Sequence, residues 1–250
     1  MPIKYNSLNC TVSAVLVIVL LFVYGPPLGM MLSTKWDART QPELWIVPQP
    51  LPATPAETSP GKSFSYFGYE FESPWTEVAI ERKFQSVAVV NFSGGQGVSV
   101  FDWRDSDGLV AAMKGGSPEQ AAALETLFGE GTMRSNYALI SRTLNVTPAD
   151  LRIFSSRQKM VGNSILLRFK QIEISRVKGH VYSFQTESFR GFQEGDPQLD
   201  RMVIINAFDV QDHKVQLLVG AKPGTNPMPT QADINRILYS FRPVSTSQVK

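Results

Sequence analysis

The chain has 250 residues, with 24 Lys and Arg against 22 Asp and Glu, a formal net charge of +2 and one cysteine. This length accommodates one globular domain with additional segments, and it suffices to bury a core without disulfides or metals. The small net charge argues against a general nucleic-acid binder, and the single cysteine excludes an internal disulfide framework and a multi-cysteine metal site.

The first part of the chain predicts a membrane-spanning helix. Residues 5–34 contain no charged side chain and are mostly apolar. A helical span needs about 20 predominantly apolar residues. We therefore assign residues 1–9 as a flank and residues 10–32 as a transmembrane signal-anchor. The Pro26-Pro27 pair is expected to kink or end this helix.

This segment admits three other interpretations. A cleaved signal peptide fits the short apolar run, but no A-x-A-like cleavage site follows it. A lipoprotein anchor requires a cysteine after the apolar run, whereas Cys10 lies before its most apolar part. A buried core helix is disfavoured because the segment is apolar all round and is followed by a linker. An uncleaved signal-anchor is the preferred interpretation.

Residues 33–63 are predicted to form a Pro-rich linker. Its prolines are Pro42, Pro48, Pro50, Pro52, Pro55 and Pro60. This composition favours an extended, polyproline-like stalk. The positive-inside count does not decide the orientation, because basic residues flank both ends of the span. An anchor followed by such a stalk is typical of proteins that face away from the cytoplasm. We expect a single-pass protein of the plasma or inner membrane with an extracytoplasmic domain.

Three helix starts have favourable local chemistry. Ser117, Thr147 and Thr230 each precede an acidic or amide side chain three residues later, which is the spacing of a capping box. Proline follows the first two, at the first helical position where it is tolerated. The helix after Thr147 is expected to stop at Gly162-Asn163.

Strand signals surround these helices. The expected strands are residues 67–71, 86–92, 98–103, 167–174, 180–189, 202–210 and 215–219. In the fourth of these, Leu167 and Phe169 alternate with basic residues, and a phase change at Ile172 is interpreted as a bulge. Hairpin-linked strands with interspersed helices predict an α+β fold in residues 64–245, with a largely antiparallel sheet covered by helices. Residues 246–250 are assigned as a tail.

One pattern in this domain resembles a known family. An aromatic strand followed by Pro74-Trp75, a hairpin, helices, a late strand meander and a last helix closed by Ser240-Phe241 resembles the PsbP-like fold. That fold is an α/β/α sandwich shared by photosystem II extrinsic proteins and Ran-binding nuclear transport factors. The resemblance covers about residues 64–245 and implies an adaptor or assembly module rather than an enzyme. No binding motif of the family matches here position by position.

Two loop motifs are better explained without ligands. Residues 56–63 fit a relaxed phosphate-loop pattern, but that loop needs a strand before it and a helix after it. Here the Pro-rich linker precedes it and an aromatic strand follows. An acidic run ending at Gly108 suggests a calcium loop. The first and last ligand positions of that loop are occupied by Trp103 and Lys114, which cannot serve as its carboxylates.

Catalytic and metal signals are weak. Neither His180 nor His213 has a Cys or His at metal-ligand spacing, and no Gly-x-Ser-x-Gly elbow occurs. A Ser-His-Asp triad whose members meet only in space stays open. We therefore expect no cofactor and no catalytic activity, with a hydrolase of spatially assembled residues as a further alternative.

Charge is unevenly distributed along the domain. The stretch from Arg142 to Lys178 has eight basic and two acidic residues, and an acidic stretch follows from Glu187 to Asp212. Pairing of these charges across the sheet is the simplest interpretation and contributes little net stability. As a candidate partner or lipid surface we take Arg152, Arg157, Lys159, Arg168, Lys170, Arg176 and Lys178.

These features together predict a non-catalytic interaction or assembly domain held outside the cytoplasm on a stalk. Its partners are expected to be the membrane, through the N-terminal helix, and an acidic protein or anionic lipid, through the basic surface. Nucleic acid is not expected as a partner. The alternative is a module that binds a lipid or small hydrophobic ligand between sheet and helices.

Overall fold

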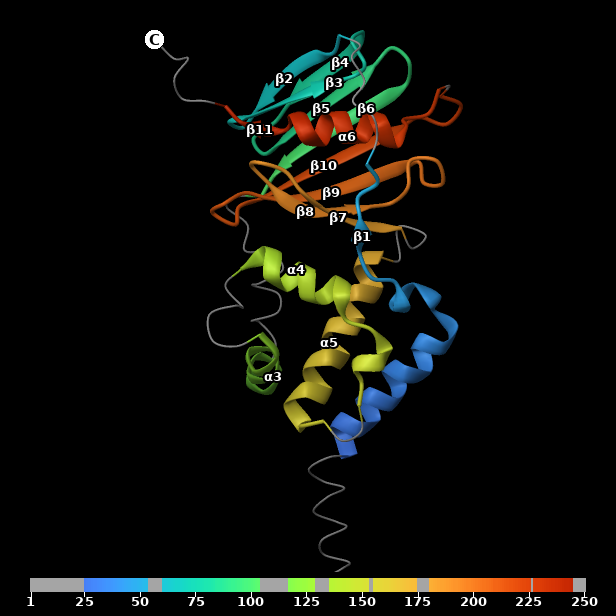
Figure 1. Ribbon diagram of the computed structural model, residues 1–250, viewed down its shortest axis with the longest axis vertical. Coiled ribbons are helices and arrows are strands. Elements are labelled where there is room, and N and C mark those ends of the chain that lie inside the picture. The colour runs from blue at the N-terminus through green and yellow to red at the C-terminus, as the bar shows by residue number, and fades with distance from the viewer. Residues whose placement is uncertain are drawn as a thin grey trace, which may run out of the picture.

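A computed structural model gives the arrangement of the chain (Figure 1). It describes residues 25–53, 60–103, 117–128, 135–152, 155–174, 180–225 and 227–244. The molecule has a sheet part and a helical part, stacked along its longest axis. Residues 10–24 of the expected signal-anchor and the expected tail, 246–250, lie outside the described residues.

Helices of two kinds are present. The chain enters the described part in a helix at residues 25–40. The others are η1 (Pro42–Trp45), α3 (Pro118–Phe128), α4 (Asn136–Asn145), η3 (Pro148–Asp150), α5 (Arg157–Ile174) and α6 (Gln231–Ser240), of which η1 and η3 are 3-10 helices. Among the described residues, no helix combines the length and the apolar character that crossing a bilayer requires.

The strands form two sheets. They are β1 (Gln49–Pro50), β2 (Lys62–Tyr66), β3 (Tyr69–Ser73), β4 (Val78–Lys83), β5 (Val87–Phe92), β6 (Gln96–Asp102), β7 (Val181–Gln185), β8 (Arg190–Glu194), β9 (Met202–Phe208), β10 (Lys214–Ala221) and β11 (Arg242–Pro243). The large sheet has the order β1-β7-β8-β9-β10-β6-β5-β4, and the small one has the order β11-β3-β2. Every pair is antiparallel except β1 with β7. The expected α+β fold, with a large and mostly antiparallel sheet flanked by helices, is confirmed.

Alternation along the strands builds the core of the sheet part. In β10, Val215, Leu217 and Val219 are buried while the residues between them are less so, because successive side chains of a strand point to opposite faces. These side chains join one hydrophobic cluster with residues of β2, β3, β5, β6 and α6. Helix α6 supplies Ile234 and Ile237 and lies against the sheets in Figure 1. The large sheet, the small sheet and α6 therefore share one core.

The helical part has its own core around α5. Leu124 of α3, Leu139 of α4 and Leu166 of α5 are fully buried in one cluster. Helices α3 and α5 approach closely at Gly162, where an added Cβ would lie 2.4 Å from the Leu127 Cδ1. Gly162-Asn163, the pair expected to stop a helix, lies inside α5 instead. Glycine is used at position 162 because a side chain there would collide with α3.

For the helix expected after Thr147, the predicted cap is confirmed and the predicted length is wrong. The capping box with Asp150 forms, but it opens only the short η3, and α5 begins at Arg157. The strand expected at residues 167–174 is wrong, since these residues belong to α5. The alternation of apolar and basic residues was misleading because Lys170 is buried like Leu167, whereas Arg168 is exposed, so the two basic residues do not mark one exposed face.

The segment expected to be a stalk differs from that expectation over residues 33–53. Ala38 and Leu44 are buried in the helical core, and β1 pairs with β7. The prolines fit because they occupy places where a missing N–H costs little. Pro42 lies in the first turn of η1, and Pro50 lies in the two-residue edge strand.

Candidate functional site: a basic cavity in the helical part

A cavity of about 860 Å³ lies among α3, α4, η3 and the first half of α5. Three cations line it, namely Arg142 from α4, Arg152 from the segment before α5, and Lys159 from the first turn of α5. All three side chains are exposed. None of them forms an ion pair with another residue that the structure describes. The cavity therefore carries positive charge that is available to a ligand.

The start of α5 contributes polar groups to the same cavity. Ser155 and Ser156 line it, and the Ser156 carbonyl accepts the hydrogen bond that begins the helix, from the Met160 N–H at 3.0 Å. The first N–H groups of a helix lack carbonyl partners within it and carry partial positive charge. Lys159 extends from this turn, so its ammonium group adds to the field of the helix terminus. Such a terminus favours an anion.

Asn163 lines the cavity and is 6% exposed. Its Nδ2 donates to the Asp150 carbonyl at 3.1 Å, which fixes the direction of the amide. Its Oδ1 is buried and has no hydrogen-bond partner among the described residues. An unpartnered buried acceptor costs roughly 1–3 kcal/mol, so a hydroxyl or ammonium donor from a ligand would be favoured there.

One carboxylate also lines the cavity, and it is already engaged. Asp150 accepts a hydrogen bond from the Thr147 N–H at 2.8 Å and another from the Thr147 hydroxyl at 3.2 Å. It thereby closes the capping box of η3. Three cations against one occupied carboxylate leave the cavity with a positive balance.

The structure separates the residues predicted from the basic stretch. Arg152 and Lys159 line the cavity. Arg157 instead points to α3, where its Nη2 lies 2.6 Å from the Glu119 Oε1. Arg168 is exposed further along α5. Arg176 and Lys178 lie outside the described residues, and Arg142 and Asn163 were missing from the predicted set.

Lys170 does not belong to this surface, because it is 1% exposed. Its ammonium group donates to the Ile46 carbonyl at 2.5 Å and to the Val146 carbonyl at 2.7 Å. Burial lowers the pKa of Lys170 to about 8, an effect that the nearby Asp150 charge opposes. This lysine is a buried connection between chain segments rather than a docking group.

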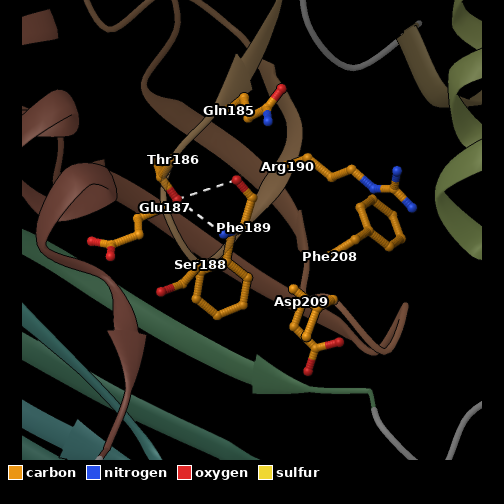
Figure 2. A pocket seen from close by; sticks show the side chains of 9 residues that line it. Gln185, Thr186, Glu187, Ser188, Phe189, Arg190, Phe208 and Asp209 are labelled. Atoms are coloured by element: carbon orange, nitrogen blue, oxygen red, sulfur yellow. Dashed lines mark hydrogen bonds between the residues drawn. The ribbon is translucent and has the colours of Figure 1, made fainter.

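A smaller cavity of about 280 Å³ lies where the β7–β8 turn meets the end of β9 (Figure 2). One of its polar side chains is used by the turn itself: the Thr186 hydroxyl accepts from the Phe189 N–H at 3.0 Å and donates to the Phe189 carbonyl at 3.2 Å. Arg190 stacks on the ring of Tyr137 at 4.1 Å. These contacts make the cavity part of the turn structure, and we do not assign it a ligand.

The two histidines meet no serine in the part of the chain that the structure describes. The His213 Nδ1 lies 3.2 Å from the Asp209 Oδ2, and the Asp209 Oδ1 accepts from the His213 N–H at 2.9 Å. This pair shapes the β9–β10 turn. The buried Nδ1 of His180 has no hydrogen-bond partner among the described residues.

Comparisons with known proteins find no matching family model, no matching curated protein and no matching solved structure. The resemblance to the PsbP-like family therefore stays a prediction, and the cavity is interpreted from its own chemistry.

Proposed function

We propose that this chain is a non-catalytic, membrane-anchored binding domain that holds a phosphate-bearing ligand in the basic cavity. The observation that carries the proposal is the convergence on one cavity, at the start of α5, of three cations that form no ion pair with any described residue. A tetrahedral oxyanion suits this set, because guanidinium groups donate two parallel hydrogen bonds to phosphate and an ammonium group adds a compact charge. The Ser156 hydroxyl adds a further donor, whereas the Ser155 hydroxyl already donates to the Arg152 carbonyl at 2.6 Å.

The unpartnered Oδ1 of Asn163 narrows the ligand class. An amide oxygen can only accept hydrogen bonds, and this one has no donor among the described residues. It therefore favours a ligand that presents a hydrogen-bond donor beside its anionic group. A phosphate ester with a neighbouring hydroxyl supplies both the anionic group and the hydrogen-bond donor. Inorganic phosphate supplies the anionic group but has no separate hydroxyl to serve as the donor. A phospholipid headgroup and a soluble phosphate ester share this chemistry.

The membrane anchor is a further part of the proposal. It rests on the uncharged residues 5–34. Figure 1 shows that the beginning of helix 25–40 and the beginning of α5 lie at the same end of the molecule, away from the sheets. We propose that the anchor lies within residues 10–32 and before Leu28, because Leu28, Met30 and Met31 pack in the core of the helical part. We also propose an extracytoplasmic position for the domain and a PsbP-like arrangement of its sheet and helices.

Binding to the full chain in detergent micelles tests the cavity. Isothermal titration would compare inorganic phosphate, glycerol 3-phosphate and a short-chain phosphatidylglycerol. We expect Arg152→Ala combined with Lys159→Ala to weaken binding at least about 10-fold, since each charge-assisted hydrogen bond contributes roughly 1.5–3 kcal/mol. Arg168→Ala is the matched control, because it removes an exposed cation of α5 outside the cavity lining.

The three ligands distinguish the sources of the anion. Tighter binding of the phosphatidylglycerol indicates a lipid headgroup, and tighter binding of glycerol 3-phosphate indicates a soluble ester. Asn163→Ala should reduce the preference for glycerol 3-phosphate over inorganic phosphate without abolishing binding. The proposal fails if none of the three binds, or if Arg168→Ala weakens binding as much as the double variant does.

A further inference from the structure

The helix at residues 25–40 presents two different stripes to its surroundings. Met31, Thr34 and Ala38 are each at most 3% exposed and follow one another at spacings of three and four residues, so they lie on one face. Met31 and Ala38 belong to the core cluster of α5. This inner stripe holds the helix against the domain.

Two large apolar side chains on the other side of this helix are exposed among the residues that the structure describes. Leu32 is 52% exposed and Trp36, one turn later, is 68% exposed. Trp45 of η1 is 54% exposed, and its indole N–H donates to the Ala38 carbonyl at 3.3 Å, which ties η1 to the end of the helix. We use the name tryptophan face for these three exposed side chains: Leu32 and Trp36 of the helix, and Trp45 of η1 next to the end of the helix. Two large indoles and a leucine left in water on one short segment are unusual for a soluble surface.

The chemistry around the tryptophan face matches a membrane interface. The charge-free residues 5–34 run into this helix, and the first charged residues after them are Lys35, Asp37 and Arg39, which lie on either side of Trp36 in the sequence. The Arg39 guanidinium lies 5.3 Å from the centre of the Trp36 ring. Indoles next to basic side chains, after a long apolar run, are typical of the headgroup region, where the ring is buried and the polar group stays wet.

We infer that the tryptophan face lies in the headgroup region of a lipid bilayer, so that the helical part rests on the membrane. This inference builds on the anchoring part of the proposed function, but it does not depend on the ligand of the basic cavity. It replaces a domain held away on a stalk by a domain held at the surface. The residues after 32 turn back onto the domain, as the burial of Ala38 and Leu44 requires.

Tryptophan fluorescence of the full chain in vesicles tests the inference. Vesicles of phosphatidylcholine and phosphatidylglycerol would be prepared with and without brominated acyl chains, which quench nearby indoles. The chain has four tryptophans. We expect Trp36→Phe combined with Trp45→Phe to remove most of the quenching. Trp75→Phe combined with Trp103→Phe is the matched control.

The control pair lies in the sheet part and should leave the quenching by bromine in place. Trp75 packs against Phe92 in the sheet core, and Trp103 follows β6. Phe keeps an aromatic ring at both exposed positions, so the thermal unfolding of the tested pair should change only by the loss of the Trp45 hydrogen bond to the Ala38 carbonyl. Quenching that survives in the Trp36 and Trp45 variant, or that vanishes in the control, overturns the inference.

Extraction at alkaline pH separates this inference from the anchor. A chain that stays in the vesicles but shows no quenching at Trp36 and Trp45 keeps its anchor and refutes the inference. A chain that is extracted, yet is quenched at those positions before extraction, supports the inference and refutes the anchor. A chain that is neither retained nor quenched refutes both.

Discussion

At the scale of single residues, Lys170 is a buried lysine whose ammonium group is held by two hydrogen bonds. Its ammonium group donates to the carbonyls of Ile46 and Val146, which follow the last residues of η1 and α4. The carbonyl ends of helices carry partial negative charge, and a cation there is favourable. One buried side chain of α5 thus satisfies two helix ends at once. Removing it leaves both carbonyls without this donor.

This lysine predicts a pH dependence of stability. Its folded pKa of about 8 lies below the value near 10.4 expected in the unfolded chain. Between about pH 8 and about pH 10 the unfolded chain holds more protons at this site, so this group's contribution to the free energy of unfolding rises with pH. In urea unfolding, the free energy of unfolding of the wild type should increase relative to that of Lys170→Met over this pH range, by up to roughly 3 kcal/mol. Parallel pH profiles would contradict the assignment.

Gly191 makes a second prediction at this scale. A Cβ on this residue of β8 would lie 2.0 Å from the Asn206 carbonyl oxygen of β9. That oxygen is backbone, so it cannot move without separating the strands, and Gly191→Ala should destabilise the chain by about 3 kcal/mol. Gly29→Ala is the control, because an added Cβ there meets nothing within 4 Å. It should stabilise helix 25–40 by up to roughly 1 kcal/mol. Denaturant unfolding of both variants checks this, and equal midpoints would contradict it.

At the scale of elements, α4 is tied to the sheet through its first turn. Asp212, in the β9–β10 turn, accepts from the Ser135 hydroxyl at 3.1 Å, from the Tyr137 N–H at 3.2 Å and from the Asn136 N–H. Asp212 has a positive φ of 66°, which aspartate tolerates better than most residues. The carboxylate thus caps a helix that lies far away in the sequence.

Removing this carboxylate should loosen α4. Asp212→Gly keeps the backbone conformation and loses the cap, so the free energy of unfolding should fall by about 1–2 kcal/mol. Asp212→Asn retains one acceptor oxygen and should lose less. Hydrogen exchange at the amides of Asn136 and Tyr137 would report the loss locally. Unchanged exchange in the glycine variant would show that the carboxylate does not hold this helix end.

Helix boundaries were predictable where the signal is local. The capping boxes at Ser117 and Thr230 open α3 and α6 as expected, because each box involves residues only three positions apart. Helix α4 was missed, since half of its cap comes from Asp212. Helix α5 was missed because its alternation of apolar and basic residues was misleading, since Lys170 is buried whereas Arg168 is exposed.

At the scale of the whole molecule, the sequence predicted the class of fold and half of the candidate site. Arg152 and Lys159 lie in the basic cavity because the charged stretch continues into the first turn of α5. Arg142 joins them only through the packing of α4. A count of charges cannot tell which cations are exposed, so Lys170 was placed on the surface although it is buried. The orphan acceptor of Asn163 is visible only once α5 is folded.

The pairing of β1 with β7 has a consequence for how the chain is made. The Ser183 hydroxyl donates to the Gln49 carbonyl across a separation of 134 residues. A ribosome that adds about 5–20 residues per second needs roughly 7–27 s to reach that partner. Until β7 has been synthesised, the proline-containing segment around β1 has no strand to pair with. The hairpins that lie between β1 and β7 in the sequence can form before then. The sheet edge at β7 is therefore closed late in synthesis, by a segment that left the ribosome early.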